Sequence, residues 1–463
     1  MSFKAVSNYQ IIHEFKNSKI GLFGIAILFF LICISIYAVL AIPLDSYRQW
    51  NNPNYWINYP KAAMPAWINI FSSQKQPEHL MLDKPIISQQ VEEGTVTVKN
   101  TYKFLFNYDF FPSDFMLNYA VQYGVIPPIV TIQLTRPDGN TFELVSKSLP
   151  SAEGNMSSFY DTIYSTQEDI KHNLRSYLHK FSYDVDDSRP EQMLFSSQSG
   201  PRVLKGQYML TQSFTFFNGE DHVLNSQLIV GGKVYGLLGT DELRRDLSVG
   251  LLWGTPIALL IGLSVSILSI LIGSVYGVMA AYKGKRIEQG MMMIVQFFVS
   301  IPTIPILIIF SVSIGQSIFL IIGFLIIFSS VGQALVSRSM GLQIKNFQYV
   351  EASKLLGERD TKIVFRHILP QLVPYLFANI ALSVPGAILG EAGLSFFGLG
   401  DPTIPTWGQI FHDAQTFSAT ARGLWWWILP PGIMIGITGF AFVLIGYTLE
   451  SLVIPKKKGN RSQ

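Results

Sequence analysis

Charged side chains are scarce in this sequence. Asp, Glu, Lys and Arg make up 14% of its 463 residues, whereas a soluble domain carries about 25%. This shortage excludes an ordinary cytosolic globular protein. The mean hydropathy of +0.31 is still too low for a chain buried in lipid throughout, so we expect a membrane part and a sizeable water-exposed part. A net charge of +3 is too small to indicate nucleic acid as a partner.

Cysteine and the common catalytic motifs are also missing. The single cysteine, Cys33, excludes an intramolecular disulfide, and its apolar surroundings predict a small buried hydrophobic residue. The sequence contains no GxxxxGK[ST] phosphate loop, no HExxH and no GxSxG. We therefore expect that the chain binds no ATP through such a loop and carries no cofactor of its own, and a hydrolase is disfavoured.

Long stretches without Asp, Glu, Lys or Arg locate the membrane part, because about 20 apolar residues cross a 30 Å hydrocarbon core. The stretches are 20–42, 247–282, 289–337, 371–390 and 423–449. The third is long enough for two crossings, and the SIGQS segment around Gly315 provides a turn between them. The sequence therefore predicts six transmembrane helices.

Basic residues set the orientation of these helices. Lys16 and Lys19 precede the first span, Lys456 to Lys458 follow the last, and further Lys and Arg follow the second and fourth. All of them lie on one side if both termini are cytoplasmic, which predicts a multi-pass protein of the cell membrane. The expected parts are a cytoplasmic segment 1–19, a first span 20–42, an outer domain 43–246, a five-helix core 247–455 and a cytoplasmic tail 456–463.

The outer segment has the signals of a folded domain. IVTIQLT and NTFELVS flank an RPDG turn and predict a hairpin, and Gly231 with Gly232 predicts a second one. Ser165 with Glu168 predicts a capping box at the start of a helix. We expect an α+β domain whose recurring aromatic residues, Trp67 among them, pack in its core, with a binding surface as the alternative. Asn155 begins a glycosylation sequon, NMS.

The predicted membrane helices lack the acidic and basic residues that ion-coupled carriers need near the midplane. Glu391, where the fifth stretch ends, is the sole acid next to a span. With Pro302 and Pro305, which should kink the third span, it is a candidate for the pathway or its gate. A secondary transporter and a charge-ring channel are disfavoured, so the energy for any transport must come from a partner.

The cytoplasmic loop 338–370 predicts a compact knob of two short helices. Asn346 is expected to cap the first helix and Gly357 to end it. Asp360 is expected to cap the second, which Pro370 should end. A rigid knob suits docking to a partner, although any basic loop between two spans could fold in this way.

Glu351-Ala352-Ser353, followed by Gly357 and by HILP at residues 367–370, resembles the EAA loop of binding-protein-dependent ABC importer permeases. Its HILP ending is typical of the dipeptide/oligopeptide branch, and two further blocks, LLGTDELRRDL and EAGLSFFGLGDPTIPTWGQ, fit that branch. The chain departs from the family pattern at Ser353, where Ala is usual, at His367, where Ile is usual, and at Arg244, where Gly is usual. By this resemblance the coupling residues are Glu351, Ala352, Ser353, Gly357, His367, Ile368, Leu369 and Pro370.

The resemblance implies an α-helical polytopic membrane protein with the six-helix ABC importer permease fold and an inserted α+β extracytoplasmic domain, which is longer than the outer segment usual in this branch. Its implied partners are a second homologous permease, two cytoplasmic ABC ATPases that bind ATP and Mg, an extracytoplasmic solute-binding protein and membrane lipid. The implied cargo is di- or oligopeptides. Oligosaccharides stay open as an alternative, as does a membrane-anchored receptor or assembly factor, whereas an exporter subunit does not fit the importer-type loop.

Overall fold

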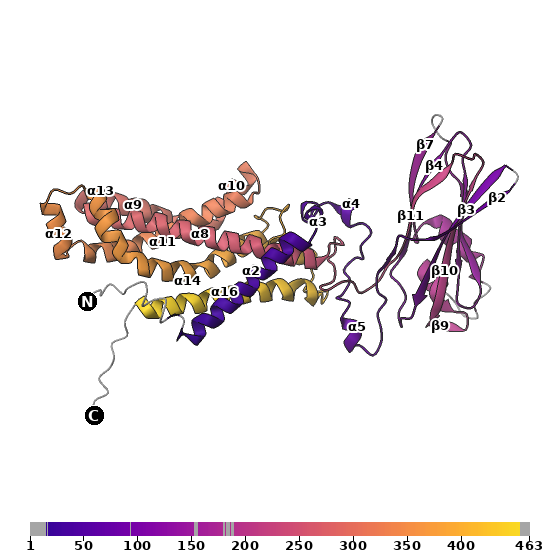
Figure 1. Ribbon diagram of the computed structural model, residues 1–463, viewed down its shortest axis with the longest axis horizontal. Helices are drawn as coiled ribbons and strands as arrows, with labels where there is room; N and C mark the ends of the chain where they lie inside the picture. Colours follow the sequence, from indigo (N-terminus) through magenta and orange to yellow (C-terminus); the bar gives the residue numbers. More distant parts are fainter. Residues whose placement is uncertain are drawn as a thin grey trace, which may run out of the picture. The chain divides into compact units, whose positions relative to one another are not determined.

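The computed structural model describes residues 15, 17–92, 94–151, 156–178, 181, 186 and 189–453. Lys16, Asn155 and Lys456 to Lys458 lie outside the described residues. The chain forms two compact units, one of residues 1–51 with 249–463 and one of residues 52–248. The first is helical and the second is rich in β-strands (Figure 1).

The helical unit is a polytopic membrane bundle. Five of its described helices are long and apolar enough to cross a membrane, and one bent pair adds a sixth crossing if it counts as one span. The long helices are α2 (Lys19–Ala41), α8 (Leu247–Lys283), α11 (Ile318–Ile344), α14 (Leu369–Phe396) and α16 (Trp425–Val453). The shorter ones are α3 (Leu44–Arg48), α9 (Lys285–Ser300), α10 (Thr303–Ile314), α12 (Gln348–Leu355), α13 (Asp360–Ile363), the π-helix η2 (Val364–Ile368) and α15 (Trp407–Thr416).

The predicted third span is broken rather than merely kinked. The axes of α9 and α10 differ by 79°. Pro302 occupies the N-cap position of α10, and Pro305 follows in its first turn, where a missing backbone N–H breaks no helical hydrogen bond. Gly315, with φ of 108°, ends α10 and confirms the predicted turn before α11.

Glycines allow α8 and α11 to pack closely. A Cβ on Gly273 would lie 2.4 Å from the carbonyl oxygen of Ser330, and one on Gly277 would lie 2.2 Å from that of Ala334. Small residues let membrane helices approach closely, and this packing matters because the hydrophobic effect does not drive helix association within lipid. Cys33 is exposed on α2, so the expectation that it is buried is wrong.

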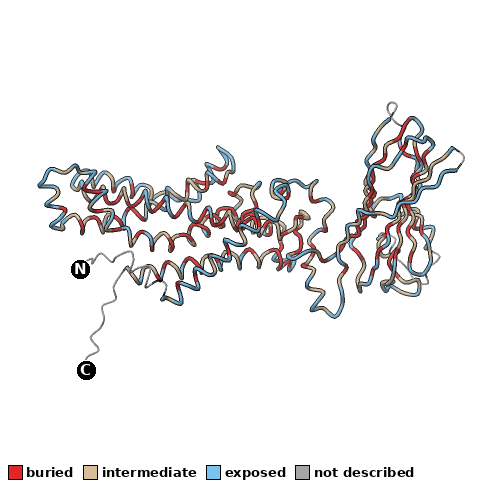
Figure 2. The backbone as a smooth tube through the Cα atoms, viewed as in Figure 1, coloured by how far each residue is buried: buried red, intermediate tan, exposed pale blue. Residues whose placement is uncertain are grey.

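The second unit is built around two antiparallel sheets. One has the strand order β1-β11-β4-β7 and the other β2-β3-β10-β5-β6. Strand β10 alternates buried and half-buried residues along most of its length, and residues of both sheets share one core, which Figure 2 shows as buried stretches on the strands of both sheets.

The strands are β1 (Leu80–Leu82), β2 (Ile86–Glu92), β3 (Thr95–Phe106), β4 (Phe115–Tyr123), β5 (Ile129–Thr135), β6 (Thr141–Ser148), β7 (Ser157–Tyr164), β8 (Ser196–Ser197), β9 (Gly200–Val203), β10 (Gly206–Phe216) and β11 (His222–Val230). Its helices are short: α4 (Pro53–Trp56), α5 (Ile68–Phe71), α6 (Glu168–Arg175) and α7 (Pro190–Phe195). The unit is therefore α+β in content, with a core formed by sheet on sheet.

The predicted local signals of this unit have mixed outcomes. The hairpin around RPDG is confirmed as β5 and β6. The hairpin at Gly231 and Gly232 is wrong, because the chain turns away from β11 there; a Cβ on Gly232 would lie 2.1 Å from the backbone nitrogen of His79, so close packing explains this glycine. The capping box is also wrong, since Gln167 precedes α6 without a side-chain cap and the Ser165 hydroxyl is buried without a hydrogen-bond partner among the described residues.

Candidate functional site

The loop between α11 and α14 forms the knob, but its helices end differently from the prediction. Phe347, not Asn346, holds the N-cap position of α12, and no described side chain caps it. Gly357 follows α12 with φ of 77°, which confirms the left-handed stop. Asp360 is the first residue of α13 rather than its cap.

Pro370 does not end a helix, which is a further correction. Helix α13 passes into the π-helix η2 and then directly into α14, where Pro370 lies in the first turn. A proline is tolerated there because the π-turn before it already changes the hydrogen-bond pattern. The second half of the knob is consequently continuous with a membrane helix, and Ile368, Leu369 and Pro370 mark the passage.

An apolar core fixes the knob to the bundle. Val350 of α12 and Ile363, Val364 and Ile368 of the following helices are buried. They pack in one cluster with residues of α8 and α11, among them Val278. Burial of a Val or Ile side chain contributes about 1.5 to 3 kcal/mol, so this cluster makes the knob a rigid extension of the helices.

Asp360 ties the knob to the end of α8. Its Oδ1 accepts a hydrogen bond of 3.0 Å from the Tyr282 hydroxyl, and its Oδ2 lies 2.6 Å from Lys283 Nζ. Lys345 Nζ donates to the carbonyl oxygen of Ala281 over 2.8 Å. These contacts join residues 64 to 78 positions apart in sequence, which is why no local pattern could predict them.

Glu358 closes the turn after Gly357. Lys362 Nζ lies 2.8 Å from its Oε1, and His367 Nε2 lies 2.7 Å from its Oε2. The hydrogen bonds from Lys362 and His367 lower the pKa of the Glu358 carboxyl. The structure thus brings the predicted His367 to a partner that sequence reasoning missed.

The other predicted coupling residues lie on an exposed surface. Glu351, Ala352 and Gly357 are exposed, and Ser353 is half-buried, donating its hydroxyl to the carbonyl oxygen of Tyr349. Leu355 and Leu356, which were not predicted as site residues, are 89% and 87% exposed. These two adjacent leucines at the end of a short helix form a candidate contact surface for a partner.

A polar cluster connects the three helices above the knob. Gln333 of α11 donates to Ser274 of α8 over 3.1 Å and to Ser337 over 2.8 Å, and it accepts from Asn379 of α14 over 2.6 Å. Gln333 and both serines are buried. Hydrogen bonds between buried polar side chains hold membrane helices together.

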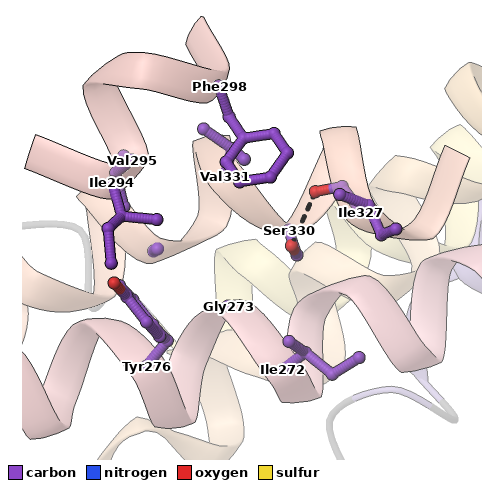
Figure 3. Close-up of a pocket in the computed structure, with 10 residues that line it drawn as sticks. Ile272, Gly273, Tyr276, Ile294, Val295, Phe298, Ile327, Ser330 and Val331 are labelled. Carbon is purple, nitrogen blue, oxygen red and sulfur yellow. Dashed lines mark hydrogen bonds between the residues drawn. The ribbon is translucent and has the colours of Figure 1, made fainter. Parts of the chain in front are cut away.

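An apolar cavity of about 110 Å³ lies between α8, α9 and α11. In Figure 3, Phe298 and Val331 line it on one side and Ile272 and Gly273 on the other. The Tyr276 hydroxyl donates to the carbonyl oxygen of Met291 over 2.9 Å. This hydroxyl proton is therefore already used and does not face a ligand in the cavity. The cavity therefore has the character of a packing defect at a helix junction rather than of a polar binding site.

The candidate pathway residues Glu391, Pro302 and Pro305 lie outside the knob, on α14 and at the start of α10. Glu391 is buried in α14, and its Oε1 accepts a 2.7 Å hydrogen bond from Ser395. It stands 22 residues beyond Leu369 in one helix, roughly 33 Å along the axis. Pro302 and Pro305 mark the break between α9 and α10.

The block LLGTDELRRDL keeps its turn despite the arginine in place of glycine. Arg244 has φ of 67°, a left-handed conformation that favours glycine. Its Nη1 donates to the carbonyl oxygen of Tyr59 over 2.7 Å. One residue on, Arg245 pairs with the buried Asp241 over 2.6 Å, so side-chain contacts compensate for the less favourable backbone.

Comparison with known proteins shows the family to which this chain belongs. Residues 269–459 match the family model of the binding-protein-dependent transport system inner membrane component. The chain belongs to this family of ABC importer permeases. The family's members are non-catalytic permease subunits, and the match includes the knob and the spans on both sides of it.

Three relatives illustrate the match. The dipeptide transport system permease protein DppC of Bacillus subtilis is 35% identical over 219 residues, which cover 47% of this chain and 68% of the relative. The oligopeptide transport system permease protein OppC of the same organism is 33% identical, covering 47% and 71%. OppC of Haemophilus influenzae is 30% identical, covering 53% and 78%.

Proposed function

We propose that this permease subunit imports di- or oligopeptides across the cell membrane. The relatives named for dipeptide and oligopeptide transport support this cargo, as does the HILP form of residues 367–370. The single observation that carries the coupling role is the exposed Leu355 and Leu356 tip on a knob continuous with α14.

The proposed assembly contains a second permease, two cytoplasmic ATPases that bind ATP and Mg, and a solute-binding protein. Both termini and the knob are cytoplasmic in this proposal, and the unit 52–248 is extracytoplasmic. The leucine tip enters a groove on an ATPase, flanked by Glu351, Ala352, Ser353 and Gly357. When ATP binding closes the ATPase pair, the knob moves as a lever because its core and the Asp360 contacts prevent it from bending.

Helix continuity determines what that movement does. Since α13, η2 and α14 follow one another without a break, displacement of the knob tilts α14. The Asn379 to Gln333 bond passes the tilt to α11 and, through Ser274, to α8. Glu391 and the α9 to α10 break are the proposed places where a gate opens.

Reconstitution tests this function. The assembled importer in liposomes should take up a labelled tripeptide only with ATP, Mg and the binding protein present. A labelled trisaccharide of similar size is the matched control. Uptake of the trisaccharide instead would move the cargo to oligosaccharides, and uptake of neither would contradict the importer assignment for this chain.

A further inference from the structure

One loop of the unit 52–248 presents an apolar tip to solvent. Ile70 is 78% exposed, Phe71 82%, Trp67 38% and Leu237 66%. The expectation that the aromatic residues of this unit pack in its core is therefore wrong for Trp67, although Trp56 is buried. We call the four side chains Trp67, Ile70, Phe71 and Leu237 the Trp67 patch.

The Trp67 patch is held rigid by its own polar contacts. The indole N–H of Trp67 donates to the carbonyl oxygen of Leu237 over 2.9 Å, which joins two segments 170 residues apart. The rings of Trp67 and Phe71 meet edge to face at 6.3 Å. A pre-organised apolar tip loses little conformational entropy on binding, so its exposure favours use as a contact surface.

The side chain of Asn69 braces the loop from inside. Its Nδ2 donates to the carbonyl oxygen of Gln76 over 2.9 Å, and its Oδ1 accepts from the backbone N–H of the same residue over 2.8 Å. Ala66 N–H bonds to the carbonyl oxygen of Gly236 over 2.9 Å. The tip therefore cannot fold back to bury Ile70 and Phe71 without breaking these bonds.

A hollow with a rim of mixed charge adjoins the patch. It has a volume of about 770 Å³ and is lined by Trp67, Ile70 and Leu105, with Lys75 and Glu78 among its polar members. Apolar anchors beside a polar rim of both signs are the anatomy of a protein interface. A loop that enters a lipid surface would instead carry Lys and Arg around its apolar side chains.

We propose that the Trp67 patch is the docking surface for the solute-binding protein. This inference rests on the proposed function, because the family depends on a binding protein. The patch contains Trp, Phe and Ile anchors of the kind that dominate interface energies. Its four side chains suit a transient partner, whereas a permanently bound second permease would need an interface of about 2,000 Å² or more.

Affinity measurements on the assembled importer in nanodiscs test the proposal. The double variant Ile70→Asp, Phe71→Asp should weaken binding of the immobilised binding protein at least tenfold. The matched control Ile87→Asp, Val91→Asp changes two side chains of β2 that are 66% and 70% exposed, and it should bind as the unchanged importer does.

A cross-linking experiment keeps the test independent of folding in the Asp variant. Benzoylphenylalanine in place of Phe71 preserves an apolar ring and should cross-link to the binding protein on illumination. Cross-links to lipid or to the second permease alone, or unchanged affinity in the Asp variant with peptide uptake intact, would overturn the docking surface and leave the importer function standing. An importer that binds no binding protein at all would overturn both.

Discussion

Asn379 of α14 donates a 2.6 Å hydrogen bond from its Nδ2 to Oε1 of Gln333 on α11. The same glutamine donates to Ser274 and Ser337, so one buried side chain joins three helices. Helix α14 also carries the knob through η2 and α13. In the proposed mechanism, the Asn379 to Gln333 bond passes knob movement from α14 to α11 and α8.

Asn379→Leu should uncouple ATP hydrolysis from uptake. The change removes one interhelical hydrogen bond worth about 0.6 kcal/mol, and up to about 1.7, while Leu fills a space of similar size to Asn. The number of ATP molecules hydrolysed per peptide imported should rise. Ser383→Ala is the control, because the Ser383 hydroxyl bonds only to Ile380 of its own helix among the described contacts. An equal ratio in both variants would remove the proposed role of this bond.

Gly357 should tolerate Asn better than Ala, and Pro not at all. A Cβ at this position would meet no described atom within 4 Å, so the φ of 77° is what restricts the side chain there. Asn adopts the left-handed region more readily than Ala, whereas Pro fixes φ near −65°. Stimulated ATPase activity should follow the order Gly, Asn, Ala, Pro. Full stimulation in Gly357→Pro would show that the turn does not matter for coupling.

The unit 52–248 and the knob should lie on opposite sides of the membrane. In a Cys33→Ala background, Ser151→Cys should react with an impermeant thiol reagent added to intact cells. Leu355→Cys should react only after the cytoplasmic side is opened, because Leu355 is exposed on the knob. Labelling of both cysteines from the same side would contradict the proposed orientation.

The fragment 52–248 should fold without the membrane helices. One core cluster spans both of its sheets, and a unit of this size can bury enough apolar surface to be stable. Urea unfolding of the purified fragment, followed by fluorescence, should show one cooperative transition. A gradual change without a plateau would mean that the unit depends on the helical bundle.

Acid should destabilise that fragment through His79. Burial lowers the pKa of His79 from 6.5 to about 4, and the neutral ring suits its partners, Asn58 oxygen at Nε2 and Gly232 N–H at Nδ1. A depressed pKa means that this stability is complete above pH 6.5 and is lost as pH falls toward 4. The loss is about 3 kcal/mol at most.

Unfolding free energies at several pH values check this prediction. His79→Gln should flatten the decline between pH 6.5 and 4, whereas the exposed His222→Gln should leave it as steep as in the unchanged fragment. Parallel curves for all three proteins would mean that other groups, and not His79, set the acid sensitivity.

Features carried by spacing along the chain could be predicted from sequence. The uncharged stretches located the membrane helices, and the spacing from Glu351 to Gly357 and on to HILP located the knob. Gly357 was predicted correctly because a left-handed helix stop is a local property of the backbone. The RPDG hairpin was predictable for the same reason.

Features set by contacts between distant parts of the chain could not be predicted from sequence. Asp is a common helix cap, but the carboxylate of Asp360 accepts hydrogen bonds from Tyr282 and Lys283 of α8 instead. Proline usually ends a helix, but the π-turn before Pro370 allows the helix to continue. Gly232 signals a turn, whereas the structure uses it for close contact with His79.

Uptake by a charge variant of the leucine tip tests the coupling account most directly. In the reconstituted importer, Leu355→Asp with Leu356→Asp places two carboxylates at the apolar tip that we propose enters the ATPase. It should abolish ATP-driven peptide uptake and stimulated hydrolysis while binding-protein affinity stays unchanged. The surface variant Gln343→Asp, on α11 before the knob, should transport normally. Normal uptake by the leucine variant would contradict the proposal that this knob carries the energy of ATP into the membrane.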